Sequence, residues 1–301
     1  MFQDGVGGPD EVAEALRTHR YLPDEGLATA IFLALRLNRP LLLEGEPGVG
    51  KTEVANVLAE WIGGPLLRLQ CYEGIDVGQA VYEWDYARQL LHLRTAEATG
   101  RAGTDGDRAL EDELYDERFL VRRPLLQAIV HADGPPPVLL IDEVDRADDE
   151  FEAFLLEILS DYSVTVPEIG TFRAAQPPVV VVTSNRTRDV HDALKRRCLY
   201  HWVAHPSADR EVEIIRLRAP EVSGRLARQV ANAAVAMRSL GLYKPPGVAE
   251  TIDWARALTL MGEDELVAGR VEATLGTLLK YREDIERVVE HDLPSMGAAD
   301  G

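Results

Sequence analysis

The sequence is poor in residues that crosslink a chain or bind transition metals. Only two of its 301 residues are cysteines, Cys71 and Cys198, and they form no C-x-x-C pair, so neither a disulfide framework nor a zinc site is indicated. We expect both to be small core residues. Seven histidines are scattered along the chain, and the nearest pair, His201 and His205, falls on a predicted strand where four residues cover roughly 13 Å. That spacing favours a structural role over a metal site.

Positive charge and long apolar runs are also scarce. The chain has 32 Lys and Arg against 51 Asp and Glu, a formal net charge of −19. A field of this sign repels nucleic acids and anionic membranes, although a local basic patch could override it. No apolar stretch approaches the roughly 18 residues of a membrane span, and residues 1–9 show no basic-then-apolar export signal. We therefore expect a cytoplasmic protein with no nucleic-acid partner and no membrane span.

A glycine-rich turn is the most specific feature that is present. Residues 40–52 read PLLLEGEPGVGKT, in which G-x-x-x-x-G-K-T follows an apolar strand at 41–43 and precedes an amphipathic helix at 52–62. Gly45, Gly48 and Gly50 let successive backbone N–H groups surround a phosphate, and the helix N-terminus adds partial positive charge. This pattern is a phosphate-binding loop (P-loop). It predicts nucleotide contacts from Glu46, Pro47, Gly48, Val49, Gly50, Lys51, Thr52 and Glu53.

Two side chains of the P-loop and two acidic residues complete the predicted site. Lys51 is a mobile cation for the phosphates of ATP, and Thr52 offers a hydroxyl to Mg²⁺. About 90 residues further on, a buried strand at 138–141 ends in Asp142 and Glu143. Asp142 can hold Mg²⁺ through water at the carboxyl edge of the sheet, and Glu143 can polarise the attacking water. The alternative, a strand that merely ends in acids, is disfavoured by the P-loop upstream.

Three further residues are candidates for catalysis. The strand at 179–182 ends in Thr-Ser-Asn, and we expect the amide of Asn185 to contact the γ-phosphate or orient water, unless it is a plain turn residue. A short helix ends in Arg196 and Arg197, just before a fifth strand at 199–203. Basic side chains at a helix C-terminus are favourable on dipole grounds alone. The functional interpretation makes Arg197, or else Arg196, an arginine finger that reaches the ATP of a neighbouring subunit.

Aromatic residues near the site have two interpretations each. Tyr21 and Leu22 separate two predicted helices, at 10–19 and 24–37, ahead of the first strand. They could lie near the adenine of a bound nucleotide or simply pack the N-terminal segment. Tyr82, Trp84 and Tyr86 recur at a spacing of two, and we favour packing against the domain over a surface that grips a partner.

The alternation of strands and helices stops at Pro206, where we place a domain boundary. Residues 10–206 are predicted to form an α/β nucleotide-binding domain, which also has a strand at 65–71, helical segments at 119–131 and 148–159, and a β-hairpin at 163–173. Residues 207–293 are predicted to form an all-α lid, with helices at 209–218, 226–240, 248–261 and 265–291. We expect flexible ends at 1–9 and 294–301 and a solvated acidic insertion at 100–117.

With these motifs in this order, the chain resembles the AAA+ ATPases over about residues 10–290. The hairpin at 163–173 resembles the pre-sensor hairpin of one AAA+ branch, and the whole pattern is most similar to the MoxR family. The phrases LLLEGEPGVGKT, VPEIGT and PGVAETIDWAR resemble the CoxD-like members of that family, which are associated with maturation of molybdenum-containing carbon monoxide dehydrogenase.

The resemblance has structural and functional implications. It implies a five-stranded parallel sheet in the order 5-1-4-3-2 with an all-α lid, a homo-hexameric ring with ATP at its interfaces, a partner with a von Willebrand A domain, and a client metalloenzyme. One position departs from the family. MoxR-type lids present an arginine from a Ser-Pro-Arg sequence before the third lid helix, whereas this chain has Lys244-Pro-Pro-Gly there. Lys244 either replaces that arginine or the contact is missing.

The leading hypothesis is therefore an ATP-driven, chaperone-like remodeller that inserts or activates a metal centre in a client enzyme. A nucleic-acid motor or restriction-type translocase on the same core is the first alternative, disfavoured by the net charge of −19. A small-molecule P-loop kinase is the second. Arg196 and Arg197 ahead of the fifth strand, together with the helical C-terminal domain, disfavour it.

Overall fold

The computed structural model describes residues 5–98 and 113–291. Of the predicted flexible ends at 1–9 and 294–301, residues 1–4 and 294–301 lie outside the described residues, as do residues 100–112 of the predicted insertion at 100–117. The chain divides into two compact units that interleave along the sequence. Unit 1 holds residues up to 12, 25–43 and 58–201, and unit 2 holds 13–24, 44–57 and everything from 202 onward. The P-loop thus belongs to the same unit as the C-terminal helices.

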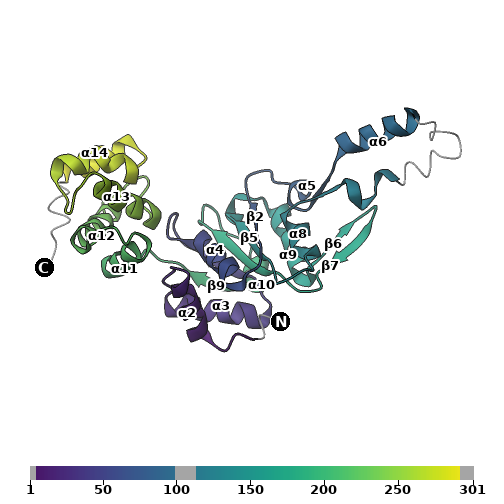
Figure 1. Ribbon diagram of the computed structural model, residues 1–301, viewed down its shortest axis with the longest axis horizontal. Helices are drawn as coiled ribbons and strands as arrows, with labels where there is room; N and C mark the ends of the chain where they lie inside the picture. Colours follow the sequence, from purple (N-terminus) through teal and green to yellow (C-terminus); the bar gives the residue numbers. More distant parts are fainter. Residues whose placement is uncertain (1–4, 99–112, 292–301) are drawn as a thin grey trace. The chain divides into compact units, whose positions relative to one another are not determined.

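The order of helices and strands follows the sequence pattern closely (Figure 1). Up to Asp142 the elements are α2 (Pro9–Thr18), α3 (Glu25–Leu37), β1 (Leu41–Glu44), α4 (Lys51–Ile62), β2 (Leu66–Gln70), α5 (Val77–Ala80), β3 (Tyr82–Trp84), α6 (Tyr86–Ala98), η1 (Glu117–Phe119), β4 (Leu120–Arg122), α8 (Pro124–Val130) and β5 (Val138–Asp142). Next come η2 (Val144–Arg146), α9 (Asp149–Asp161), β6 (Ser163–Val166), β7 (Gly170–Arg173), β8 (Val179–Ser184), α10 (Asp192–Arg197) and β9 (Leu199–Trp202). The C-terminal helices are α11 (Ala208–Arg218), α12 (Gly224–Arg238), α13 (Val248–Leu260), α14 (Ala268–Leu278) and α15 (Arg282–Glu290).

Five strands form one parallel sheet in the order β2-β5-β8-β1-β9. This is the predicted order 5-1-4-3-2, read from the other edge, so that prediction is confirmed. The strands β2, β5 and β8 pair in parallel, with Gln70 opposite Asp142 and Ile141 opposite Val182. On β1 and β9, hydrogen bonds join Leu199 to Pro40 and Val203 to Glu44 at equal steps along both strands, as parallel pairing requires. The carboxyl ends of β2, β5 and β8 therefore lie side by side.

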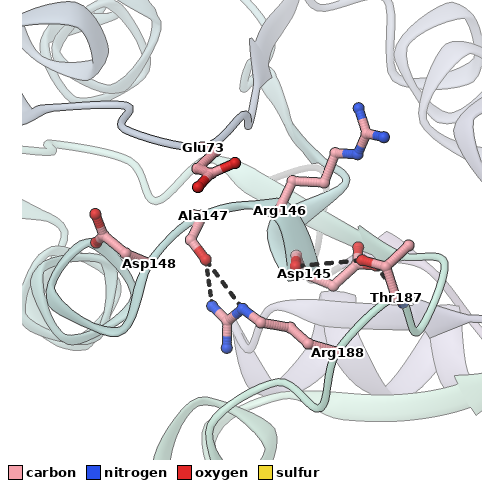
Figure 2. A pocket seen from close by; sticks show the side chains of 7 residues that line it. All are labelled: Glu73, Asp145, Arg146, Ala147, Asp148, Thr187 and Arg188. Carbon is pink, nitrogen blue, oxygen red and sulfur yellow. Dashed lines mark hydrogen bonds between the residues drawn. The ribbon is translucent and has the colours of Figure 1, made fainter.

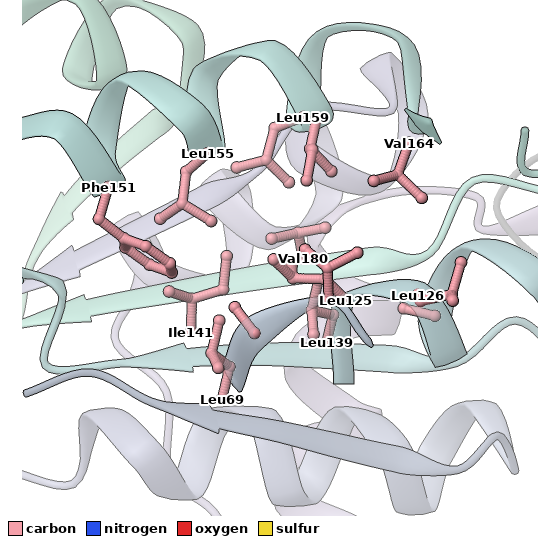
Figure 3. Packing of buried hydrophobic residues seen from close by; sticks show 14 of the residues in the cluster. Leu69, Leu125, Leu126, Leu139, Ile141, Phe151, Leu155, Leu159, Val164 and Val180 are labelled. Carbon is pink, nitrogen blue, oxygen red and sulfur yellow. The ribbon is translucent and has the colours of Figure 1, made fainter. Parts of the chain in front are cut away.

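The main core of unit 1 lies between the sheet and the helices α8 and α9. Figure 3 shows Leu155 and Leu159 of α9 facing Ile141 of β5 and Val180 of β8, all of them buried. The strand β5 is buried along its whole length, as expected for a parallel strand covered on both faces. A fully packed sheet holds the polar residues at its strand ends in fixed positions.

Two short antiparallel strand pairs accompany the sheet. The predicted hairpin at 163–173 is confirmed as β6 and β7, and β3 pairs with β4. On β3, Trp84 is buried with its ring 5.3 Å from that of Tyr115 in an edge-to-face arrangement. Tyr86 begins α6 and is 70% exposed. The packing interpretation of the aromatic trio therefore holds for Trp84 but not for Tyr86.

Two predicted helices are wrong in extent. Residues 119–131 do not form one helix, because Arg123 before Pro124 is extended (φ −92°, ψ 171°) and α8 can begin only at the proline. Residues 265–291 form two helices rather than one. The first ends at Leu278, where Lys280 Nζ donates to the carbonyls of Gly276 and Thr277 (3.0 and 2.8 Å). A side-chain cation thus satisfies carbonyls that a continuing helix would have bonded.

The C-terminal helices pack around their own hydrophobic core. At its centre Trp254 is fully buried, and its indole N–H donates to Thr274 Oγ1 (2.8 Å). A buried indole N–H needs such a partner. Among the described residues, no helix combines the length and the apolar character needed to cross a bilayer.

Both cysteines are free and buried, as the sequence predicts. Burial raises the pKa of the Cys71 thiol, and also that of Cys198, to about 12. We therefore expect neither thiol to react with dithionitrobenzoate at pH 8 in the folded protein, because the thiolate is the reactive form. Two thiols should react once guanidinium unfolds the chain, and absorbance at the nitrothiobenzoate band counts them. Rapid modification of a thiol in the folded protein would contradict this burial.

Candidate active site

The P-loop lies in unit 2, and its main-chain carbonyl groups bind the ammonium group of its own lysine. Gly48 and Gly50 adopt positive φ angles (80° and 95°), which side chains disfavour. Lys51 opens α4 and is 5% exposed, and its Nζ donates to the carbonyls of Gly45 and Glu46 (2.8 Å each). The ammonium group is therefore already inside the loop. An incoming phosphate would exchange for these carbonyls rather than draw the lysine out of water.

Neighbouring residues of unit 2 contact the start of the loop. A Cβ at Gly45 would lie 2.2 Å from the carbonyl oxygen of Val203, so this glycine is required by close backbone packing. Glu46 Oε2 lies 3.0 Å from His205 Nε2. Burial, and then the nearby positive charge of Arg238, lowers the pKa of His205.

Glu53, which follows the P-loop, and Tyr21 and Leu22, between α2 and α3, also have partners in unit 2. Glu53 Oε1 accepts from Arg218 NH1 (2.6 Å), which ties the first turn of α4 to α11. Tyr21 Cε2 lies 3.9 Å from a Cβ built on Gly50, and the carbonyl of Leu22 accepts from Arg210 NH2 (2.7 Å). Tyr21 is therefore a neighbour of the P-loop, and contact with adenine stays a prediction.

The first acidic residue lies in unit 1 at the end of β5. Asp142 is 3% exposed, and both carboxylate oxygens are hydrogen-bonded. Thr183 Oγ1 donates to Oδ1 (2.6 Å), and Arg68 NH2 donates to Oδ2 (2.5 Å). These two partners come from β8 and β2, the strands on either side of β5. The carboxylate is thus oriented from both neighbouring strands.

The second acidic residue is held in an unusual backbone conformation. Glu143 has left-handed angles (φ 55°, ψ 51°), which cost a non-glycine residue energy and concentrate at functional sites. Its N–H donates to Thr183 Oγ1 (2.9 Å). Its carboxylate accepts from Asn185 Nδ2 (3.2 Å) and from Gln70 Nε2 (3.3 Å). The structure therefore brings Asn185 to Glu143, and contact of Asn185 with the γ-phosphate or with water stays a prediction.

A buried carboxylate fixes the loop that carries Asn185. Asp145 is 2% exposed and accepts from the N–H of Asn185 (3.1 Å) and from the N–H and hydroxyl of Thr187 (2.8 and 2.7 Å). Figure 2 shows Asp145 and Thr187 beside Arg188, whose guanidinium donates to the carbonyl of Ala147. These residues border a polar cavity of about 570 Å³, lined by Glu73, Asp145, Arg146, Ala147, Asp148, Thr187 and Arg188.

The two candidate arginine fingers end α10 in unit 1. Both side chains are exposed, and the guanidinium of Arg197 donates to Ser160 Oγ on α9. Arg39 Nε donates to the carbonyl of Arg197 (2.9 Å) and its NH2 to that of Arg196 (2.6 Å). Arg39 thus caps the helix end that presents the two arginines.

Lys244 is placed by its main chain rather than by its side chain. Its N–H donates to Asp284 Oδ2 (3.0 Å), and its side chain is exposed. Lys244 lies in the connector between α12 and α13, residues 239–247. The residue of this connector that contacts the P-loop is Gly247, which lies next to Gly48. A phosphate contact from Lys244 therefore stays a prediction.

Several residues of the site have only weak signals in the sequence. Thr183 stands in the Thr-Ser-Asn run, and Arg68 and Gln70 alternate on β2 at the spacing that places them on one face. Asp145 and Arg39 carry no motif. Their roles depend on hydrogen bonds between residues 40 or more positions apart.

The bridging hydroxyl of Thr183 gives a test of this arrangement. Thr183 is 1% exposed, so Thr183→Val leaves a buried carboxylate oxygen and the N–H of Glu143 without this partner. We expect the free energy of unfolding in urea to fall by about 1–3 kcal/mol. Thr165→Val is the matched control, because Thr165 pairs with Thr171 on the exposed hairpin, and a change within about 0.5 kcal/mol is expected. Equal stability of both variants would remove Thr183 from this role.

More than half of the chain matches a known family. The family model "AAA domain (dynein-related subfamily)" matches residues 40–198. The chain is 30% identical over 176 residues to YehL of Escherichia coli K12, covering 56% of this chain and 42% of YehL, and 46% identical over 50 residues to midasin of Giardia intestinalis, covering 17% of this chain and 1% of midasin. It therefore spans less than half the length of these curated relatives.

A solved structure is also similar. The RuvB Holliday junction branch migration motor of Thermotoga maritima superposes with a TM-score of 0.45 at 18% identity, covering 92% of this chain and 73% of RuvB. The family model covers more than half of the chain and begins at the P-loop strand. The chain therefore belongs to the dynein-related subfamily of AAA domains, a family of P-loop ATPases that use ATP with Mg²⁺.

Proposed function

We propose that this chain hydrolyses ATP through its P-loop and the carboxylate pair Asp142 and Glu143, and uses that reaction to remodel another protein. One observation carries the catalytic part. Glu143 is held from both sides of β5, by Gln70 on β2 and by Asn185, which follows β8. A carboxylate that is oriented by an amide from the adjacent strand is equipped to position an attacking water.

The P-loop residues suit the phosphates of ATP. The positive φ angles of Gly48 and Gly50 turn the main chain so that N–H groups can converge on an anion. Lys51 supplies the cation and exchanges its two loop carbonyls for phosphate oxygens. Glu46, Pro47, Val49 and Glu53 complete the loop and the first turn of α4. Glu46, Val49 and Glu53 would contribute main-chain N–H groups and the helix N-terminus, whereas Pro47 has no N–H and would contribute only its fixed backbone angle.

The donor set also fits Mg²⁺ that arrives with the nucleotide. Within residues 5–98 and 113–291, no group of three or more His, Cys, Asp or Glu side chains is arranged to hold a metal ion. Mg²⁺ in nucleotide sites is held by one or two protein oxygens together with phosphates and water. Thr52 and Asp142 would supply these oxygens, and the bound ion would neutralise phosphate charge. Arg68 NH2 donates to one oxygen of Asp142.

The arginines at the end of α10 are proposed to act across a subunit interface. Arg197 and Arg196 are exposed, and Arg39 fixes the main chain from which both project. A guanidinium supplied by a neighbouring subunit stabilises the charge that develops on the transferred phosphoryl group. Each site of the proposed homo-hexamer would then need two chains. Arg197 remains our first choice and Arg196 the second.

The client and partner are proposed from the MoxR and CoxD-like resemblance of the sequence. The hairpin of β6 and β7 lies between Asp142 and Asn185 in the chain, as in the pre-sensor hairpin branch. We propose that the ring works with a protein that carries a von Willebrand A domain on a client metalloenzyme of the molybdenum hydroxylase type. Because the chain covers 42% of YehL, further segments in such relatives are outside this proposal.

Replacing the catalytic carboxylate separates binding from hydrolysis. We expect Glu143→Gln to bind a fluorescent ATP analogue as the parent does, because the P-loop is unchanged, and to release phosphate at least about 100-fold more slowly. Glu150→Gln is the matched control, since Glu150 is exposed on α9, and it should hydrolyse ATP at the parent rate. Normal phosphate release by Glu143→Gln would refute the assigned role.

Mixing two inactive variants tests the shared site. We expect Arg197→Ala alone to lose about 10³-fold or more in turnover. Mixed in equal amounts with Glu143→Gln before assembly, it should recover about a quarter of the parent rate, because half the sites keep Glu143 and half of those face an intact Arg197. Ser160→Ala controls for the contact within the chain. A mixture no more active than its components would exclude catalysis across the interface.

A further inference from the structure

The start of α13 is capped by the P-loop. The first N–H of this helix, that of Val248, donates to the carbonyl of Gly48 (2.8 Å), and both residues belong to unit 2. The N-cap residue, Gly247, provides no side-chain hydrogen bond to the helix. The first N–H groups of a helix need partners from outside it. One of them finds its partner in the loop proposed to hold the phosphates.

The contact leaves no room for a side chain on either glycine. A Cβ on Gly48 would lie 2.7 Å from Gly247 Cα, and a Cβ on Gly247 would lie 2.7 Å from Gly48 Cα and 2.9 Å from Gly48 O. Gly48 also has a positive φ of 80°, which favours glycine by itself. Gly247 does not, since its angles (φ −82°, ψ 173°) are available to any residue. Glycine at 247 is therefore required by packing alone, against Gly48 and against Glu250 Oε2, which lies 2.6 Å from the same Cβ.

The connector that presents Gly247 is held at its C-terminal side by a buried ion pair. Arg238 Nε donates to the carbonyl of Pro246 (2.9 Å), and the guanidinium forms a bidentate pair with the fully buried Glu211 (2.6 and 2.7 Å). Thr251 Oγ1 donates to the carbonyl of Gly247 (2.9 Å). Bidentate pairs of this kind fix orientation as well as distance.

A second buried carboxylate holds the other side of the connector. Asp284 is 1% exposed and accepts from the N–H groups of Tyr243 (2.8 Å) and Lys244 (3.0 Å). Pro245 lies between the two anchors, and Pro246 carries the second of them. Proline has a fixed φ and little freedom to yield. The connector is therefore rigid, and it holds Gly247 in contact with Gly48 of the P-loop.

The charge at the contact argues against a direct role in binding phosphate. Glu250 Oε2 lies 3.5 Å from a Cβ built on Gly48, and within the described part of the chain this buried oxygen has no hydrogen-bond partner. A carboxylate there would repel a phosphate group. The helix start is thus suited to contact the loop and not the anion inside it.

We propose that Gly247 and Val248 are positioning residues that couple the C-terminal helices to the P-loop through main-chain contact. This proposal rests on the proposed ATP site. A P-loop encloses the phosphates that ATP and ADP share. Through this contact, the helices therefore respond to whether the P-loop holds a nucleotide and do not distinguish ATP from ADP.

Two substitutions at one position separate the contact from helix capping. Gly247→Ala adds a Cβ and is a poor N-cap, whereas Gly247→Ser adds the same Cβ and is a favoured N-cap. Because overpacking at the contact forces the backbones apart, we expect both variants to bind ADP and a non-hydrolysable ATP analogue about 10-fold more weakly. The ratio of the two affinities should stay within about twofold of the parent value.

Gly276→Ala is the matched control for these variants. Gly276 lies in α14, and a Cβ there meets nothing within 4 Å, so its nucleotide affinities should equal those of the parent. Thermal unfolding followed by circular dichroism checks that every variant is folded. Parent-like binding by Gly247→Ser would overturn the proposal, and so would a loss confined to the ATP analogue, since that pattern belongs to a γ-phosphate sensor.

Hydrogen exchange in the nucleotide-free protein gives a readout that needs neither ATP nor a variant. We expect the Val248 amide to be protected in the parent and to exchange faster in Gly247→Ala, because its acceptor is Gly48 O. An unprotected Val248 amide in the parent would overturn the contact itself. If the parent bound no nucleotide while Val248 remained protected, the proposed ATP function would fail and the contact would stand.

Discussion

The hydroxyl of Thr183 is the interaction on which the arrangement of the catalytic residues depends. It donates to the carboxylate of Asp142 and accepts from the main chain of Glu143, so one oxygen atom on β8 orients both acids at the end of β5. Because the group is buried, a lost partner is not replaced by water. The strand pairing that places Thr183 beside Asp142 is thus as much a part of the site as the acids themselves.

The two units hold their polar residues by the same physical means. In unit 1 the buried Asp145 accepts three hydrogen bonds from the loop that carries Asn185. In unit 2 the buried Asp284 accepts two from the connector that carries Gly247. A buried carboxylate with several N–H donors is costly to release, so both segments keep their shape without regular secondary structure.

The sequence was sufficient where a local pattern has a single physical meaning. A regular spacing of apolar residues that ends at a characteristic residue predicts the P-loop, the strand that ends in Asp142 and Glu143, and the fifth strand after Arg197. The resemblance to the family implied the strand order, which the sheet confirms. The break at Leu279 was missed because a lysine side chain, rather than glycine or proline, ends the helix. The contacts of Arg68 with Asp142 and of Arg39 with Arg197 join residues 74 and 158 positions apart, and no local period encodes them.

The left-handed backbone of Glu143 has a consequence for how such a chain can change over time. Glycine would adopt these angles without strain, so the folded state would gain from losing this side chain. Keeping the acid means that selection for turnover opposes selection for a more robust fold at this one position. In a descendant that no longer needed the reaction, replacement of Glu143 by glycine would be favoured. A glycine at position 143 would then indicate that hydrolysis has been lost.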